Sequence, residues 1–264
     1  MKLAVAATAP FGADVLERLA VHHDVALLLT RPDKPRGRGR KLAPTPAKAV
    51  AERLGIPVAQ PARLGDDVEI PVDTVVVAAY GLLIPETLLD RALWLNVHPS
   101  LLPRWRGAAP VERALMAGDT RTGVTIHRTT PDLDAGPIAA QEAFDVQPED
   151  DAGTVFARSA EIAARLIGDV LPEPQFTLQP DDGATYAEKI TPEDRNLDLT
   201  RPARENVDHV RALSPHIGAR AVVDERPLIV WKARVADDGS LELLEVQPEG
   251  GTRMPFEAYQ RGRR

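Results

Sequence analysis

The chain has 264 residues, a formal net charge of −7, 44% hydrophobic and 27% charged residues, and no cysteine. This length and apolar content allow one large domain or two modest ones, each with its own core. The absence of cysteine excludes disulfides, thiolate metal sites and a cysteine nucleophile. The acidic balance argues against a protein that binds nucleic acid over its whole surface.

The first 171 residues alternate short apolar runs with amphipathic segments. Helices are expected around residues 15–19 and at residues 48–54 and 153–171. Strands are expected at residues 3–7, 25–30, 74–79, 93–97 and 123–128. Such alternation predicts an α/β fold with a Rossmann-like, doubly wound parallel sheet. Ligands of such sheets bind beyond the carboxyl ends of the strands.

The first twenty residues also have a second interpretation, as a secretory signal peptide, because a lysine precedes small apolar residues. The apolar stretch breaks at Pro10, however, and a charged amphipathic segment follows. A buried first strand is therefore the preferred interpretation. No apolar run is long enough to span a membrane. We expect a cytoplasmic protein that works as a monomer.

The second part of the chain has a different character. Residues 171–183 contain three prolines and few apolar anchors, which is typical of a linker. A helix is expected at residues 202–213, followed by short strands at 221–224, 228–234 and 241–247. We therefore divide the chain into an α/β domain at residues 1–171, a linker at 172–184 and a small β-rich domain at 185–264.

Several common site motifs are missing. The sequence has no GxxxxGK[ST] phosphate loop, no GxGxxG and no GxSxG, and its six histidines lack helical metal-ligand spacing, so we expect no metal. One charged segment stands out instead. Residues 31–48 carry seven basic residues against one acid, Asp33. A patch of this kind binds polyanions even on an acidic protein, although a solvated surface is the alternative interpretation.

The most informative stretch is LNVHPSLLPRWRGAAP, at residues 95–110. Asn96 and His98 are two residues apart and therefore share one face at the end of a predicted strand. An amide beside an imidazole is suited to donating hydrogen bonds to a carbonyl oxygen that gains negative charge. A turn containing Asp132 and Asp134 comes about 35 residues later, and its carboxylate is suited to orienting the imidazole. Residue types alone leave a purely structural role open for both segments.

The stretch LNVHPSLLPRWRGAAP, followed by GVTI and DLDAG, closely resembles the folate-dependent formyltransferases. Those enzymes carry Asn-x-His, then Ser-Leu-Leu-Pro, and a later aspartate in an x-Asp-x-Gly turn. Further segments resemble the branch that formylates methionyl-tRNA, namely residues 30–61, AYGLLIP at 79–85, TYAEKI at 185–190, WKARV at 231–235 and VQPEGGTRM at 246–254. The resemblance covers nearly the whole chain, with a shortened C-terminal domain.

The resemblance implies a Rossmann-like formyltransferase domain followed by a small barrel-like domain, with 10-formyltetrahydrofolate as co-substrate and no metal. It implies that Asn96, His98 and Asp134 are catalytic. The folate is expected to contact Tyr80, Leu82, Ile84, Ser100, Leu101, Leu102, Pro103 and Asp132. The basic segment is expected to contact a charged initiator tRNA through Arg36, Arg38, Arg40 and Lys41.

Three functions are compatible with this resemblance. The first is formylation of the α-amine of methionyl-tRNA in translation initiation, favoured by the basic segment. The second is formylation of a small amine, such as a sugar nucleotide or glycinamide ribonucleotide. It is favoured by His127, by Pro99, by Gly136 followed by Pro137, and by the short C-terminal region. The third is a non-catalytic RNA- or folate-binding module, which the intact Asn96, His98 and Asp134 set disfavours.

Overall fold

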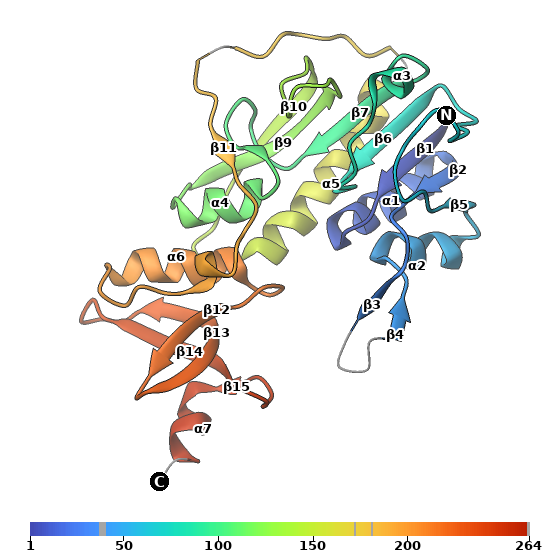
Figure 1. Ribbon diagram of the computed structural model, residues 1–264. Helices are drawn as coiled ribbons and strands as arrows, with labels where there is room; N and C mark the ends of the chain where they lie inside the picture. The colour runs from blue at the N-terminus through green and yellow to red at the C-terminus, as the bar shows by residue number, and fades with distance from the viewer. Residues whose placement is uncertain (37–40, 172, 181, 263–264) are drawn as a thin grey trace. The chain divides into compact units, whose positions relative to one another are not determined.

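The computed structural model describes residues 1–36, 41–171, 173–180 and 182–262, and Figure 1 shows its helices and strands. The chain forms two compact units. The first unit comprises Met1–Arg106, Gly123–Ala143 and Ala157–Thr185. The second unit comprises Gly107–Thr122, Phe144–Phe156 and Tyr186–Arg264. Both units draw on the first 171 residues, which the sequence analysis treats as one domain.

A seven-stranded sheet organises the first unit, in the order β10-β9-β7-β6-β1-β2-β5. Its strands are β1 (Lys2–Ala7), β2 (Asp24–Leu29), β5 (Val58–Ala59), β6 (Thr74–Ala78), β7 (Leu93–His98), β9 (Arg121–Arg128) and β10 (Ile138–Asp145). The pairs β1–β2, β1–β6, β6–β7 and β2–β5 are parallel. This confirms the Rossmann-like α/β prediction.

One strand departs from the expected parallel arrangement. β9 runs antiparallel to β7, with Asn96 opposite His127 and His98 opposite Thr125. The apolar run of a buried strand is the same in either direction, so the sequence pattern carries no signal for strand direction. The consequence for the site is that His127 lies directly opposite Asn96.

The helices of the first unit follow from local signals. α1 (Pro10–His22) begins with a proline and buries Phe11, Val15, Leu16 and Leu19. α2 (Pro46–Leu54) is capped by Thr45, whose hydroxyl accepts the N–H of Lys48 at 3.1 Å, and it ends at Gly55 with φ 70°. α3 (Glu86–Leu89) is a single turn, and α5 (Ala152–Val170) is the long helix that the sequence predicts.

The order of the strands reverses at β1. The strands β2 and β5 lie on one side of β1 in the sheet. The next strands along the chain, β6 and β7, lie on its other side. Ligands of open α/β sheets bind at such a reversal, beyond the carboxyl ends. The loops that follow β6 and β7 both leave the sheet at this edge, and His98 is the last residue of β7.

The second unit is built on a four-stranded antiparallel sheet, with the strands β12 (Ala219–Val223), β13 (Arg226–Val235), β14 (Leu241–Pro248) and β15 (Met254–Pro255). Its core contains Val210 and Leu213 from α6 (Ala203–Leu213), Val230, Val246, and Tyr259 from α7 (Phe256–Arg261). α4 (Pro110–Met116) and η1 (Glu193–Arg195) also belong to this unit. The predicted β-rich C-terminal region is confirmed.

Four short strands complete the secondary structure, namely β3 (Lys34–Arg36), β4 (Lys41–Ala43), β8 (Arg106–Gly107) and β11 (Tyr186–Ala187). β3 and β4 pair as an antiparallel hairpin, with Arg36 opposite Lys41. In the part of the chain that the structure describes, no helix is both long and apolar enough to cross a membrane.

The glycines of two helices predict opposite effects of alanine. A Cβ on Gly12 in α1 would lie 2.2 Å from the carbonyl oxygen of Ala78 and 2.8 Å from the Cβ of Ala7, so α1 must move off the sheet. We expect Gly12→Ala to lower the free energy of unfolding by about 1–3 kcal/mol. A Cβ on Gly168 in α5 would have its nearest neighbouring atom 3.9 Å away, so Gly168→Ala should raise the free energy of unfolding by about 0.5–1 kcal/mol. Urea unfolding of both variants tests this; equal effects would contradict it.

Candidate active site

Asn96 and His98 lie on one face of β7 and meet Asp134 from the turn after β9. The side-chain N–H groups of Asn96 donate to Oδ1 of Asp134 at 3.2 Å and to Nε2 of His127 at 2.9 Å. A carboxylate only accepts hydrogen bonds, which fixes the orientation of the Asn96 amide. The structure thus brings together the three residues that the sequence analysis singled out as catalytic.

The buried ring of His98, which is 4% exposed, has two different neighbours. Its Nε2 lies 2.7 Å from the carbonyl oxygen of Trp105. A carbonyl has no proton to give, so Nε2 carries the hydrogen and donates it. Its Nδ1 faces Oδ2 of Asp134 at 3.6 Å. The backbone of Trp105 thereby selects the tautomer, and Nδ1 is the nitrogen left for chemistry.

Burial lowers the pKa of His98, and the neighbouring His127 lowers it further. The Asp134 carboxylate and the Trp105 carbonyl act in the opposite direction but do not overcome burial. His98 is therefore neutral at pH 7, with a lone pair on Nδ1. A proton that arrives at Nδ1 finds the Asp134 carboxylate beside it, so the site is arranged as a base whose protonated form is stabilised.

The turn that carries Asp134 is held in an unusual conformation. Asp134 has φ 47°, in the left-handed region that residues other than glycine rarely adopt. A Cβ on Gly136 would lie 1.8 Å from the carbonyl oxygen of Arg128, so only glycine fits there. Strained backbone of this kind concentrates at functional sites. This observation favours a functional role for the turn over the structural alternative that residue types left open.

His127 also belongs to the cluster, although the sequence analysis used it only to compare branches of the family. Its Nε2 accepts from Asn96 and lies 3.5 Å from Oδ1 of Asp134, while its Nδ1 lies 3.1 Å from the carbonyl oxygen of Arg128. His127 is therefore an orienting partner of Asn96. The direction of β9 was the missing signal. Within the described ranges, no group of three or more histidines and acidic residues is arranged to hold a metal ion.

The loop after β7 contains four of the residues predicted to contact folate. The Ser100 hydroxyl donates to the carbonyl oxygen of Arg104 at 2.7 Å, and Leu102 is buried with its N–H donating to Oγ1 of Thr125 at 3.1 Å. Both residues therefore fix the shape of the loop. Leu101 and Pro103 are only partly buried. Their apolar side chains remain partly accessible at the surface of this loop.

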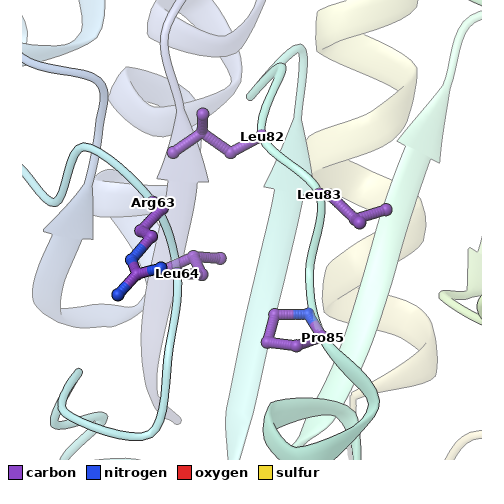
Figure 2. Close-up of a pocket in the computed structure, with 5 residues that line it drawn as sticks. All are labelled: Arg63, Leu64, Leu82, Leu83 and Pro85. Atoms are coloured by element: carbon purple, nitrogen blue, oxygen red, sulfur yellow. The ribbon is translucent and has the colours of Figure 1, made fainter.

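The loop after β6 forms one wall of a pocket of about 310 Å³. Figure 2 shows Leu82, Leu83 and Pro85 on this wall and Arg63 and Leu64 on an earlier segment of the chain. Of the residues predicted for folate, Leu82 lines the pocket. The sequence analysis gave no role to Arg63 and Leu64, because neither belongs to a motif, whereas Leu83 and Pro85 lie in the AYGLLIP segment.

Two other residues predicted to contact folate, Tyr80 and Ile84, pack into the core beneath this loop. The Tyr80 hydroxyl is buried without a hydrogen-bond partner among the described residues, and burial raises the pKa of Tyr80 to about 12. The predicted Asp132 is exposed in its turn. These residues support or border the loops of the site.

The basic segment forms the β3–β4 hairpin. Arg38 and Arg40 lie outside the described residues, and Lys34 and Lys41 are exposed on the two strands. At the base of the hairpin, Nζ of Lys48 lies 2.8 Å from Oδ2 of Asp33. This ion pair neutralises the only acid of the segment. The remaining basic residues are left as a net positive charge.

A Rossmann-like sheet that ends in an amide, a neutral imidazole and a carboxylate defines a site for group transfer to or from a carbonyl carbon. Comparison with known proteins identifies the class. Residues 1–171 match the family described as formyl transferase, and residues 189–239 match the formyl transferase C-terminal domain. The chain belongs to the formyl transferase family.

Several similar proteins carry the name methionyl-tRNA formyltransferase. That of Dechloromonas aromatica is 38% identical, with 99% of this chain and 96% of the relative covered. That of Roseobacter denitrificans is 40% identical, with 95% and 92% covered. The alignment with the former runs over 294 positions against 264 residues here, so the relative has insertions that this chain lacks.

Solved structures share the fold at low sequence identity. A methionyl-tRNA formyltransferase from Clostridium thermocellum has a TM-score of 0.67 at 14% identity, covering 94% of this chain and 98% of that chain. An N-formyltransferase from Helicobacter canadensis, in complex with folinic acid and dTDP-3-aminofucose, has a TM-score of 0.68 at 15% identity, covering 90% and 88%. At this identity the likeness concerns the fold.

The arrangement around His98 predicts the effect of Asp134 on its titration. Because the Asp134 carboxylate raises the pKa of His98, Asp134→Asn should lower that pKa further. An NMR titration of the His98 ring in both proteins measures the shift. Asp132→Asn is the matched control, since this exposed carboxylate shares the turn. A His98 pKa that rises or stays constant in Asp134→Asn would show that the two side chains are uncoupled.

Proposed function

We propose that this chain transfers the formyl group of 10-formyltetrahydrofolate to the α-amine of methionyl-tRNA, and that it works in the cytoplasm as a monomer. The observation that carries the chemistry is the buried His98 ring, with Nδ1 3.6 Å from the Asp134 carboxylate at the carboxyl end of β7. The acceptor is supported by the 38–40% identity, over nearly the full chain, to proteins named methionyl-tRNA formyltransferase.

The reaction begins when the amine nitrogen attacks the formyl carbon, and the formyl oxygen gains negative charge. Asn96 is the donor to this oxygen. Its two N–H groups engage His127 at 2.9 Å and Asp134 at 3.2 Å, and the longer bond is the one exchanged for the substrate. A donor that strengthens its bond as charge develops contributes about 10²–10³ in turnover.

His98 moves the proton. Its Nδ1 takes the proton that the amine releases as the new carbon–nitrogen bond forms, and Asp134 stabilises the resulting imidazolium. The same proton then passes to N10 of the folate as the bond between the formyl carbon and N10 breaks. The products are the formylated amine and tetrahydrofolate. Holding both substrates at the edge of the sheet supplies the remaining rate enhancement.

The folate is proposed to bind at the loops that follow β6 and β7. The apolar pocket wall of Leu82, Leu83 and Pro85 suits an aromatic ring system, and the loop after β7 adds the partly buried Leu101 and Pro103. Arg63 on the other wall provides a cation for the carboxylates of the glutamate tail. Tyr80, Ile84, Ser100 and Leu102 belong to these loops, and Asp132 lies in the turn after β9; we propose that they border the bound folate.

The tRNA is proposed to meet the basic hairpin. Arg36, Arg38, Arg40 and Lys41 are all basic, and the single acid of residues 31–48, Asp33, is paired with Lys48. Arginines alternating with glycines follow a curved phosphate backbone, and each phosphate contact releases counterions.

A small amine remains a second candidate acceptor. His127 in the site and the shortened C-terminal region favour it. It is also supported by the likeness in fold to the Helicobacter canadensis enzyme, whose complex contains dTDP-3-aminofucose.

We expect the protein and 10-formyltetrahydrofolate to formylate charged initiator tRNA in preference to a nucleotide-linked amino sugar or glycinamide ribonucleotide. His98→Ala and Asp134→Asn should each lower turnover by at least about 10²–10³, because they remove groups that act as charge develops. Folate binding, measured by calorimetry, should remain largely intact. Formylation of a small amine alone would establish the second candidate, and turnover of both variants within about tenfold of wild type would refute the site.

Replacing Arg36, Arg38 and Arg40 together by alanine should weaken tRNA binding and formylation. The slope of log affinity against log salt should flatten by up to about three phosphate contacts. The control replaces Arg18, Arg53 and Arg91, each already paired with a carboxylate of the first unit. An unchanged slope and unchanged formylation in the hairpin variant would show that this segment is only a solvated surface.

A further inference from the structure

The segment predicted as a linker does more than connect two parts of the chain. Thr177 forms an antiparallel bridge with Ile138 at the start of β10, with hydrogen bonds of 2.7 and 2.9 Å in the two directions. Leu178 next to it is 82% exposed. The segment therefore lies along the outer edge of the sheet in the first unit and is fixed there by backbone hydrogen bonds.

Gln179, unlike its exposed neighbours, turns its side chain inward. Its Nε2 donates to the carbonyl oxygens of Asp134 and Gly136, both at 2.8 Å. Its Oε1 accepts from Nε and Nη2 of Arg106, at 3.1 and 2.7 Å. Carbonyls only accept and a guanidinium only donates, so these partners fix which end of the amide points where. Only glutamine and asparagine carry a side-chain amide, which combines an NH2 group that donates two hydrogen bonds with an oxygen that accepts them. The asparagine side chain is one methylene group shorter.

These bonds act on the backbone of the catalytic turn. Asp134 has φ 47°, a conformation that persists only where the surroundings hold it. The Gln179 amide binds the backbone carbonyl of Asp134 and the backbone carbonyl of Gly136, which lies two residues further along the turn. The turn so held keeps the Asp134 carboxylate 3.2 Å from Asn96 and 3.6 Å from Nδ1 of His98.

The other end of the same segment binds the loop after β7, which contains Trp105. Thr185 accepts the N–H of Trp105 with its hydroxyl at 2.9 Å and the N–H of Arg106 with its carbonyl at 2.8 Å. Trp105 also has a positive φ, 66°, and its backbone carbonyl accepts the hydrogen bond from Nε2 of His98. One segment thus contacts both of the strained turns that surround His98.

We propose that Gln179 is a positioning residue that holds the strained turn of Asp134, with Arg106 orienting its amide. The inference rests on the proposed function, because it assigns Asp134 to catalysis. Gln179 touches no reacting atom and acts through the turn. A displacement of about 1 Å at a catalytic group costs up to about 100-fold in rate, so the loss of this contact has a measurable consequence.

The test compares Gln179→Leu, Gln179→Glu and the control Gln175→Leu, which changes an exposed glutamine of the same segment. Gln179→Glu keeps the acceptor for Arg106 but cannot donate to the two carbonyls. Both Gln179 variants should lose about 10–100-fold in kcat, with little change in KM for the folate. In Gln179→Leu the pKa of His98 should also fall, because the Asp134 carboxylate moves away. Gln175→Leu should behave as wild type.

Three results would overturn the proposal: kcat within about twofold of wild type, full activity in Gln179→Glu, or an unchanged His98 pKa in a folded Gln179→Leu. Thermal unfolding of each variant shows that it is folded. The titration is measured without any acceptor. If wild type formylates no amine, the proposed function fails, while the His98 pKa still decides whether Gln179 positions the turn.

Discussion

The site depends on one hydrogen bond, from Nε2 of His98 to the carbonyl oxygen of Trp105. It places the proton of the neutral ring on Nε2 and leaves the lone pair of Nδ1 facing Asp134. Burial keeps the ring neutral, and the carboxylate stabilises the cation that forms when a proton arrives. The position of His98 at the end of β7, the bend at Trp105 and the turn of Asp134 all serve this arrangement.

The arrangement is held by strain that other contacts offset. Trp105 and Asp134 both have positive φ, and residues in such conformations cost of order 1–3 kcal/mol each. Thr185 bonds the first and Gln179 the second, and both lie in the part of the chain between α5 and β11. His127, opposite Asn96 in the antiparallel register, orients the amide from the other side. Asn96, His98 and Asp134 are thus supported from several parts of the first unit.

Sequence patterns predicted five of the seven strands of the sheet, but not β5 or β10, and they placed Asn96 and His98 together at the end of a strand. The runs at 74–79 and 93–97 are apolar and short, and Asn96 and His98 are on one face because side chains alternate along a strand. The direction of β9 was not predictable, since a buried apolar run is symmetric, and the place of His127 depends on it. Gln179 was missed because its segment is polar and rich in proline. Its role comes from contacts with residues more than 40 positions away, which no local pattern encodes.

The most direct test of this account is the tautomer of His98. Nitrogen NMR of histidine-labelled protein at pH 7 distinguishes a ring protonated on Nε2 from one protonated on Nδ1 or on both nitrogens, and a His98→Gln variant assigns the signal. The account predicts a neutral ring with the hydrogen on Nε2 and an unprotonated Nδ1. A neutral ring with its hydrogen on Nδ1, or a ring fully protonated at pH 7, would contradict it.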